Sequence, residues 1–200
     1  MRLMRPIWEG AAAVPDDAPS DAELWARGDE RAFGLLYDRY AEAVWNHAYR
    51  LTASWSTAED LTSATFMTAW RRRAEMTLVR DSALPWLFTV AGFLARSEFR
   101  RKARFTRLLH RMPRNEVQRD HADDVAESLD HEARLREVLE AVERLPRAER
   151  EAVELVLLGE LSTAQAAEAL GVAEVSVRSR ISRARTRLRK QLSFDTLEVR

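Results

Sequence analysis

The sequence of 200 residues contains no cysteine, which excludes disulfide frameworks, thiolate zinc sites and cysteine nucleophiles. It has no excess of either charge, because 32 Lys and Arg residues balance 32 Asp and Glu residues. No apolar run approaches the roughly 18 residues that a membrane-spanning helix needs, and the first ten residues lack the apolar core of a signal peptide. We therefore expect a cytoplasmic protein without membrane insertion.

The balanced charge is a sum over segments of opposite sign. Seven basic residues and one acid lie from Arg96 to Arg111, and seven basic residues without any acid lie from Arg178 to Lys190. Seven acids lie between residues 113 and 136. A solvated surface helix normally carries both signs, whereas DNA phosphates attract only one. Neutrality therefore does not exclude nucleic acid, and the two basic segments are candidates to bind it.

Apolar residues recur at steps of three and four through most of the chain, and no segment alternates with a period of two for long enough to indicate a strand. This pattern predicts an all-α fold with two small helical domains joined by an acidic flexible linker. The predicted ranges are a disordered tail at 1–19, a first domain at 20–111, the linker at 112–131, a second domain at 132–194 and a tail at 195–200.

Local signals predict where helices of the first domain begin. Ser56 and Glu59 have the spacing of a capping box, which predicts a helix over about 57–74. Ser82 followed by Pro85 predicts the start of the next helix, because proline is favoured in the first turn.

The sequence over residues 163–182 has the pattern of a helix-turn-helix. Ser162 can cap the first helix, Gly171 can adopt the positive φ of a tight turn, and Val177 and Ile181 can anchor the second helix. Ordinary bundles also contain helical hairpins with a glycine turn, but an arginine run without acids favours DNA binding. In this motif the second helix enters the major groove, so the second domain is predicted to bind duplex DNA.

Polar side chains near the start of that second helix are the candidates for base contacts, because arginine pairs with guanine and serine accepts several partners. Basic side chains farther along are candidates for phosphate contacts, which position the protein without reading sequence. The predicted duplex-binding residues are Ser176, Arg178, Ser179, Ser182, Arg183, Arg185, Arg187 and Lys190.

Aromatic residues precede the other basic segment, a combination suited to single-stranded nucleic acid, where cations follow the backbone and rings stack on bases. Aromatic residues at helical spacing, here Trp86, Phe88 and Phe93, are also common in helix cores. The predicted single-strand-binding residues are Trp86, Arg96, Arg100, Arg101, Lys102 and Arg104.

Together these segments resemble a bacterial RNA polymerase sigma factor of the extracytoplasmic-function (ECF, group 4) subfamily. The sequence FGLLYDRY from residue 33, TAEDL from residue 57 and PWLF from residue 85 resembles region 2 of that family. The segments LPRAEREAV from residue 145 and SVRSRISRARTRL from residue 176 resemble region 4. The resemblance covers about residues 20–111 and 132–192.

The resemblance implies that region 4 reads the −35 promoter element as duplex, with Arg178, Ser179 and Arg183 at base-contact positions. It implies that region 2 captures unpaired bases of the −10 element. It also implies that region 2 grips the polymerase through the helix holding Asp60, Leu61, Phe66 and Trp70. The expected partners are core RNA polymerase, promoter DNA and an anti-sigma factor, and no cofactor is expected.

Four positions depart from the family pattern. Ser63 and Ala64 stand where the family often has Gln-Glu, Phe93 stands where an asparagine is common, and Ser97 stands where an aspartate is frequent. At these positions the family's polar contacts to polymerase and its −10 base preference are therefore not carried over to this chain.

The main alternative is an autonomous helix-turn-helix repressor or activator, because response-regulator output domains share the Leu-x-x-x-Glu-Arg-Glu opening before their helix-turn-helix. That alternative predicts tight DNA binding without polymerase, as a dimer on paired half-sites. An enzyme is not expected. The four histidines are scattered without metal-ligand spacing, and no glycine-rich loop is present to cradle a phosphate.

Overall fold

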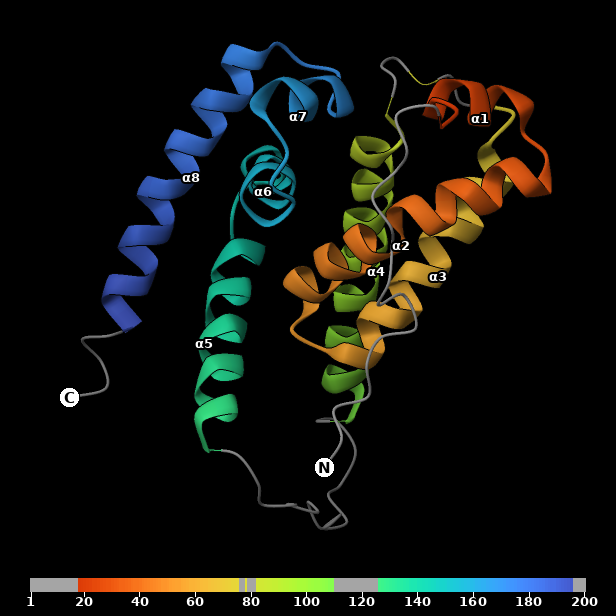
Figure 1. The fold of residues 1–200 in the computed structure, drawn as a ribbon. Helices are drawn as coiled ribbons and strands as arrows, with labels where there is room; N and C mark the ends of the chain where they lie inside the picture. The colour runs from red at the N-terminus through yellow and green to blue at the C-terminus, as the bar shows by residue number, and fades with distance from the viewer. Residues whose placement is uncertain (1–17, 76–77, 79–81, 110–125, 196–200) are drawn as a thin grey trace.

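The structure is a computed structural model that describes residues 18–75, 78, 82–109 and 126–195 (Figure 1). Within these ranges every regular element is a helix, which confirms the predicted all-α fold. Most of both predicted tails and of the predicted linker lies outside the described residues. The elements are α1 (Asp21–Arg27), α2 (Glu30–Thr52), α3 (Trp55–Arg72), α4 (Leu84–Leu109), α5 (Ala126–Glu143), α6 (Arg147–Val153), the π-helix η1 (Glu154–Leu158), α7 (Thr163–Ala169) and α8 (Glu174–Asp195).

The helical conformation is interrupted between α1 and α2, although the apolar pattern of the sequence continues without a break from residue 20 onward. Ser20 and Glu23 form a capping box at the start of α1, and Gly28 ends that helix with a φ of 59°. Asp29 then accepts the backbone N–H of Ala32 at 2.7 Å and begins α2. The left-handed conformation at the glycine redirects the chain, so α1 folds back against α2.

Helix α3 begins earlier than the capping signal predicts. The side chain of Ser54 accepts the backbone N–H of Thr57 at 3.4 Å and caps the helix. The prediction of a capping box at Ser56 and Glu59 is therefore wrong. The reason is backbone geometry, because Ser54 has the extended conformation that a cap requires, whereas residue 56 already lies inside α3.

A buried carboxylate, Asp21, ties α1 to α2 and to the start of α4. Asp21 is 1% exposed and accepts hydrogen bonds from Arg39, from the hydroxyl of Tyr40 at 2.6 Å and from the backbone N–H of Ala83 at 2.6 Å. Burial and the hydrogen bond to Asp21 raise the pKa of Tyr40 to about 12. No local sequence signal identifies this cluster, because its members lie far apart in the chain.

The second half confirms the predicted helix-turn-helix signals. Ser162 caps α7 in a capping box with Gln165, and Gly171 adopts a φ of 64° in the turn before α8. The preceding helix continues from α6 into the π-helix η1, which the sequence does not predict. Helix α5 begins at Ala126, inside the range that the sequence predicts as linker.

The two halves share one continuous hydrophobic core. Buried residues of α4, such as Leu87 and Phe88, belong to the same cluster as Val153 and Leu155 of the second half. His47 of α2 is fully buried and stacks on Phe88 with ring centroids 4.2 Å apart. Burial lowers the pKa of this histidine to about 4. Figure 1 shows α6 and α7 between α8 and the first half.

The close approach of the halves at Gly159 gives a test of this packing. A Cβ at residue 159 would lie 2.6 Å from the backbone oxygen of Leu155 and 3.0 Å from Cδ2 of Phe88. We expect Gly159→Ala to destabilise the fold by about 1–3 kcal/mol, because the added methyl overpacks the interface. Urea denaturation measures the change.

The matched control is Gly34→Ala in α2, where an added Cβ meets no atom within 4 Å. This change should stabilise the protein by about 0.5–1 kcal/mol, since alanine favours the helix over glycine. Equal effects of the two substitutions would contradict the close packing at Gly159.

Candidate nucleic-acid interface

Helices α7 and α8 meet in a tight helix-turn-helix. The backbone N–H of Val172 donates to the carbonyl of Ala167 at 2.9 Å and closes the turn. Ala167 packs against the buried Val177 and Ile181 of α8, so the two helices cross closely. Because one side of α8 is buried in this way, its opposite side faces outward.

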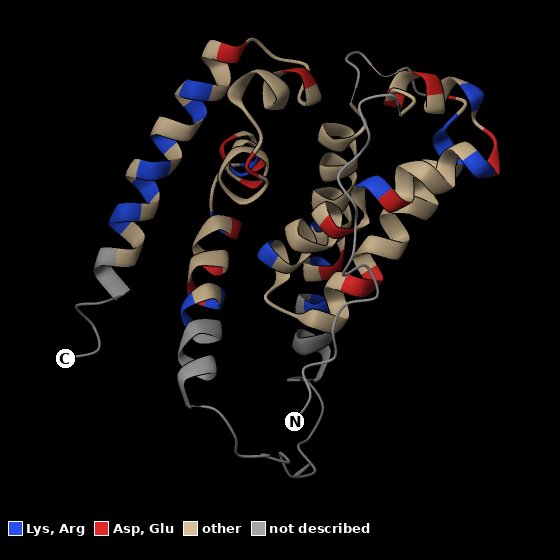
Figure 2. Ribbon diagram, in the orientation of Figure 1, with Lys and Arg blue, Asp and Glu red and all other residues tan. Residues whose placement is uncertain are grey.

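The outward face of α8 carries a central strip of one valine, three small hydroxyl residues and one lysine between two rows of arginines. Helical spacing places this central strip opposite the buried Val177, Ile181 and Ala184. The strip consists of Val175, Ser179, Ser182, Thr186 and Lys190. The first row consists of Arg178, Arg185 and Arg189, and the second of Arg183 and Arg187. Among the coloured residues of α8, Figure 2 shows basic positions repeated along the helix and an acidic position at its beginning.

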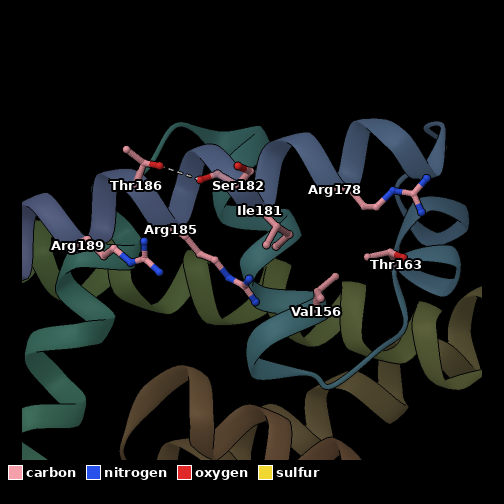
Figure 3. A pocket seen from close by; sticks show the side chains of 8 residues that line it. All are labelled: Val156, Thr163, Arg178, Ile181, Ser182, Arg185, Thr186 and Arg189. Atoms are coloured by element: carbon pink, nitrogen blue, oxygen red, sulfur yellow. Dashed lines mark hydrogen bonds between the residues drawn. The ribbon is translucent and has the colours of Figure 1, made fainter.

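The first arginine row borders a groove of about 490 Å³ between α8, η1 and α7 (Figure 3). Val156 and Ile181 form apolar parts of its wall, and Thr163 lies near Arg178. Glu174 fixes this end of the row, because its Oε1 accepts the hydroxyl of Thr163 at 2.6 Å and Nη1 of Arg178 at 2.7 Å.

The second arginine row is held by Glu149 of α6. This carboxylate is 5% exposed and lies 3.4 Å from Nε of Arg183 and 3.0 Å from Nε of Arg187. Both arginine side chains remain more than half exposed. The pairing thus anchors α8 on α6 while it leaves both cations accessible to solvent. Of the predicted duplex-binding set, only Ser176 is half-buried, and the others are exposed.

Helix α4 presents only part of the predicted single-strand set on its outward face. Arg100 and Arg104 are exposed and share a helical face with Phe93, which is 59% exposed. Arg101 instead pairs with Glu98 through two hydrogen bonds of 2.9 Å.

Two further members of this set make contacts inside the first half. Lys102 donates to the hydroxyl of Thr57 at 3.3 Å. Trp86 is half-buried and packs edge-on against Trp25, with ring centroids 5.5 Å apart. The ring of Trp86 is therefore partly engaged in the core of the first half.

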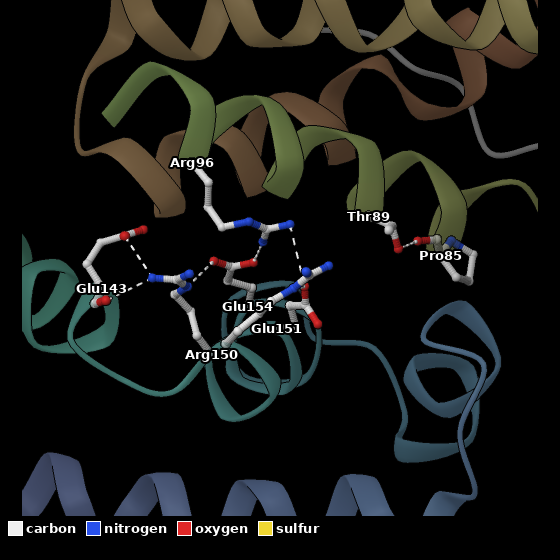
Figure 4. Close-up of polar contacts among 8 residues, drawn as sticks. Pro85, Thr89, Arg96, Glu143, Arg150, Glu151 and Glu154 are labelled. Atoms are coloured by element: carbon white, nitrogen blue, oxygen red, sulfur yellow. Dashed lines mark hydrogen bonds and ion pairs between the residues drawn. The ribbon is translucent and has the colours of Figure 1, made fainter. Parts of the chain in front are cut away.

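Arg96 faces the second half of the protein and not the outward face of α4 (Figure 4). Its guanidinium pairs with Glu154 of η1 and lies 3.9 Å from Glu151 of α6, and its side chain is 11% exposed. The neighbouring Gly92 makes room for the pair, because a Cβ there would lie 3.1 Å from Oε2 of Glu154. The structure therefore separates Arg96 from the other predicted single-strand-binding residues.

Glu154 is the buried member of this network. Burial raises the pKa of Glu154 to about 7, and the nearby Glu143 and Glu151 act in the same direction. Arg96 and Arg150 lower that pKa but do not outweigh burial. Arg150 in turn donates to Glu143 at 3.0 Å, so the network extends from α4 across η1 and α6 to α5.

The predicted polymerase-binding residues of α3 divide between core and surface. Leu61 and Phe66 are buried, whereas Asp60 is exposed. Trp70 is half-buried under the guanidinium of Arg73, which lies 3.6 Å from the ring centroid. Met67, which the sequence analysis did not single out, is 51% exposed on α3 and lies on the same helical face as Asp60, seven residues earlier.

The four departures from the family pattern lie on α3 and α4, and none of them is fully buried. Ser63, Phe93 and Ser97 are exposed, and Ala64 is half-buried. Ala64 and Ser97 line a groove of about 310 Å³ together with Asp60 of the predicted polymerase-binding set. The small side chains at both positions leave this groove open.

Comparison with known proteins matches each half of the chain to a protein family. Residues 36–105 match the family described as Sigma-70 region 2, and residues 135–188 match Sigma-70, region 4. The ECF RNA polymerase sigma factor BldN of Streptomyces coelicolor is 36% identical over 189 residues, which cover 92% of this chain and 70% of that protein. The chain belongs to the ECF sigma factor family.

Other sigma factors align with most of this chain. SigL of Mycobacterium tuberculosis is 34% identical over 161 residues, covering 78% of this chain and 86% of that protein. The structure of CnrH in complex with the cytosolic domain of CnrY aligns with a TM-score of 0.59, 25% identity and coverage of 88% and 99% of the two chains. The sigma factor RpoE with the anti-sigma factor NepR, from Bartonella quintana, aligns with a TM-score of 0.53, 25% identity and coverage of 82% and 99%.

The family matches coincide with the two halves of this sigma factor. The region 2 match includes α3 and most of α4, and the region 4 match includes the whole helix-turn-helix. None of the helices in the described ranges has the length and apolar composition needed to cross a membrane. Nor do His, Asp and Glu side chains in those ranges gather into a group that could hold a metal ion.

The buried ion pair between the halves gives a prediction about stability. At a pH above 7, where Glu154 is ionised, we expect Arg96→Ala to destabilise the fold by about 3 kcal/mol, because it leaves the buried carboxylate without its closest cation. Arg101→Ala is the control, since Arg101 is exposed to solvent and its pair with Glu98 should contribute little to stability. Thermal and urea denaturation measure both. Similar losses would contradict a special role for the buried pair.

The raised pKa of Glu154 predicts a pH dependence of stability. Its folded pKa of about 7 exceeds the ordinary value of 4.5, so the folded protein binds more protons than the unfolded chain between these pH values. The free energy of unfolding should therefore fall as the pH rises from about 4.5 to 7, by about 3 kcal/mol from this group. Glu154→Gln should remove this contribution. Parallel pH profiles of the two proteins would contradict the assignment.

Proposed function

We propose that this ECF sigma factor directs RNA polymerase to promoters by placing α8 on the −35 duplex and the outward face of α4 on the −10 strand. The observation that carries the proposal is the acid-free run of α8 on a helix-turn-helix, with one arginine row on each side of its outward strip. ECF sigma factors are initiation factors for RNA polymerase, and both regions of the family are present.

The shape of α8 suits the major groove of duplex DNA. That groove is about 12 Å wide and admits a single helix. With the start of α8 toward the base edges, Arg178, Ser179 and Ser182 meet those edges. Farther along the helix, Arg185, Arg187 and Lys190 meet phosphates. Arg183 pairs with Glu149 and, in this placement, also contacts the DNA.

The outward face of α4 suits an unpaired strand. Arg100 and Arg104 supply cations for the backbone, and Phe93 supplies a ring on the same face. Arg101 and Lys102 lie beside this face and add positive charge near the strand. We propose that Trp86 supports this face through its contact with Trp25, and that Arg96 holds the second half instead of DNA.

Helix α3 offers the surface for core RNA polymerase. Asp60 and the exposed edge of Trp70 are the proposed contacts from the predicted set. The buried Leu61 and Phe66 act by fixing α3 against α2 and α4. The exposed Met67 adds an apolar contact that polymerase can cover.

An anti-sigma factor is a further proposed partner. CnrH and RpoE, which share the fold of this chain, were solved with the cytosolic domain of CnrY and with the anti-sigma factor NepR.

We propose domain limits of 20–111 and 132–194, in line with the two family matches. Acting on polymerase and the chromosome, the protein works in the cytoplasm and performs no bond chemistry itself.

An autonomous repressor or activator is not favoured. Such a protein needs the helix-turn-helix and a dimer interface, but it has no use for a region 2 domain. The family matches include region 2 over residues 36–105, and the relatives BldN and SigL are ECF sigma factors.

The division between base and phosphate contacts on α8 can be tested with the reconstituted holoenzyme. Arg178→Ala should relax the sequence preference within the −35 element, because it removes a base contact. Lys190→Ala should weaken binding to all promoters alike and lower the slope of log affinity against log salt by about 0.9, the value for one phosphate contact. Promoter-library transcription and salt titration measure the two effects.

The control is Arg144→Ala, which removes one exposed cation from outside the helix-turn-helix. It should change neither the sequence preference nor the salt slope. If Arg178→Ala and Lys190→Ala instead behave identically in both assays, the proposed orientation of α8 is wrong.

A further inference from the structure

Val175 is the most exposed of the large apolar residues in the described part of the chain, with 63% of its surface accessible. It is the second residue of α8 and stands on the outward strip, four residues before Ser179 and seven before Ser182. The buried side of α8 is formed by Val177, Ile181 and Ala184. Val175 therefore lies on the outward side of α8, and its exposure does not come from fraying of a core position at the helix end.

Folding supplies no reason for a valine at this position. A β-branched residue is a weaker helix former than alanine, and Val175 gains little from burial. Single exposed apolar side chains are common on protein surfaces. The position of Val175 distinguishes it, because the N-terminal residues of the second helix in a helix-turn-helix meet the base edges.

Arg178 lies one helical turn after Val175, beside the start of α7. Glu174 accepts hydrogen bonds from both Arg178 and Thr163, and the Arg178 side chain remains 59% exposed. Three residues along a helix advance about 4.5 Å, and one base step along B-DNA advances about 3.4 Å. The two side chains can therefore reach neighbouring base pairs.

The chemistry of the two side chains corresponds to two features of the major groove. Arginine pairs with the O6 and N7 atoms of guanine, and an apolar side chain contacts the 5-methyl group that only thymine presents. The small Ser176 and Ser179 beside Val175 leave room for its methyl groups to approach the DNA.

We propose that Val175 reads the 5-methyl group of a thymine in the −35 duplex, beside a guanine read by Arg178. This inference rests on the proposed placement of α8 on that duplex. It makes Val175 a specificity-determining residue, which distinguishes thymine from cytosine because cytosine has no methyl group at that position.

Replacement of thymine by deoxyuridine removes that methyl group and nothing else. The experiment uses the full chain with core polymerase and a promoter from which this holoenzyme initiates. Each thymine of the −35 element, on either strand, is replaced in turn, and competition binding is measured. The wild-type holoenzyme should lose about fourfold in affinity at one thymine, the factor for one buried carbon group. The Val175→Ala holoenzyme should lose nothing further at that thymine.

A second base analogue supplies the matched control. Replacement of guanine by 7-deazaguanine removes the N7 acceptor that an arginine uses. Val175→Ala should keep its sensitivity to 7-deazaguanine, and Arg178→Ala should lose it. This comparison shows that the valine variant still folds and places α8 in the groove.

Two results would overturn the role of Val175. One is a wild-type holoenzyme that binds the promoter but tolerates deoxyuridine at every position, and the other is an equal loss in the Val175→Ala variant. A wild-type chain that gives no promoter-specific initiation with core polymerase would instead contradict the proposed function.

Discussion

The ion pair between Arg96 and Glu154 joins the two halves of the protein, and the arrangement of the surrounding helices depends on it. Both side chains are almost completely buried, so each has lost the hydration that normally stabilises its charge. The attraction between them offsets part of that cost, and the Arg150–Glu143 pair extends the compensation into α5. The glycine at position 92 makes room for the pair, because a Cβ there would lie 3.1 Å from Oε2 of Glu154. Arg96 lies in a basic segment of the kind that binds DNA, but its side chain links the two halves of the protein.

Acidic residues have a comparable structural role on the helix-turn-helix. Glu149 holds Arg183 and Arg187 from beneath, and Glu174 holds Arg178 from the start of α8. These carboxylates order the arginine side chains without covering them. A chain with a net charge of zero can present this basic surface because Glu149 lies beneath it, Glu174 lies at its edge and most other acids lie elsewhere in the sequence.

The helix-turn-helix could be predicted because its determinants are local. The Ser162 cap and the positive φ at Gly171 depend on neighbours within a few residues. The start of α3 was missed for a related reason, since two serines lie close together and only backbone geometry selects Ser54. The role of Arg96 could not be predicted, because Glu154 lies 58 residues further along the chain.

The sequence by itself determined the helical class, the helix-turn-helix, the two basic segments and the resemblance to both sigma regions. These follow from residue spacing and composition, which act through backbone conformation over short distances. Only the tertiary structure decided which arginines face solvent and which are paired. It also decided that Leu61 and Phe66 lie in the core and that both halves share one core. Burial and ion pairing depend on distances in space, and the packing of whole helices sets those distances.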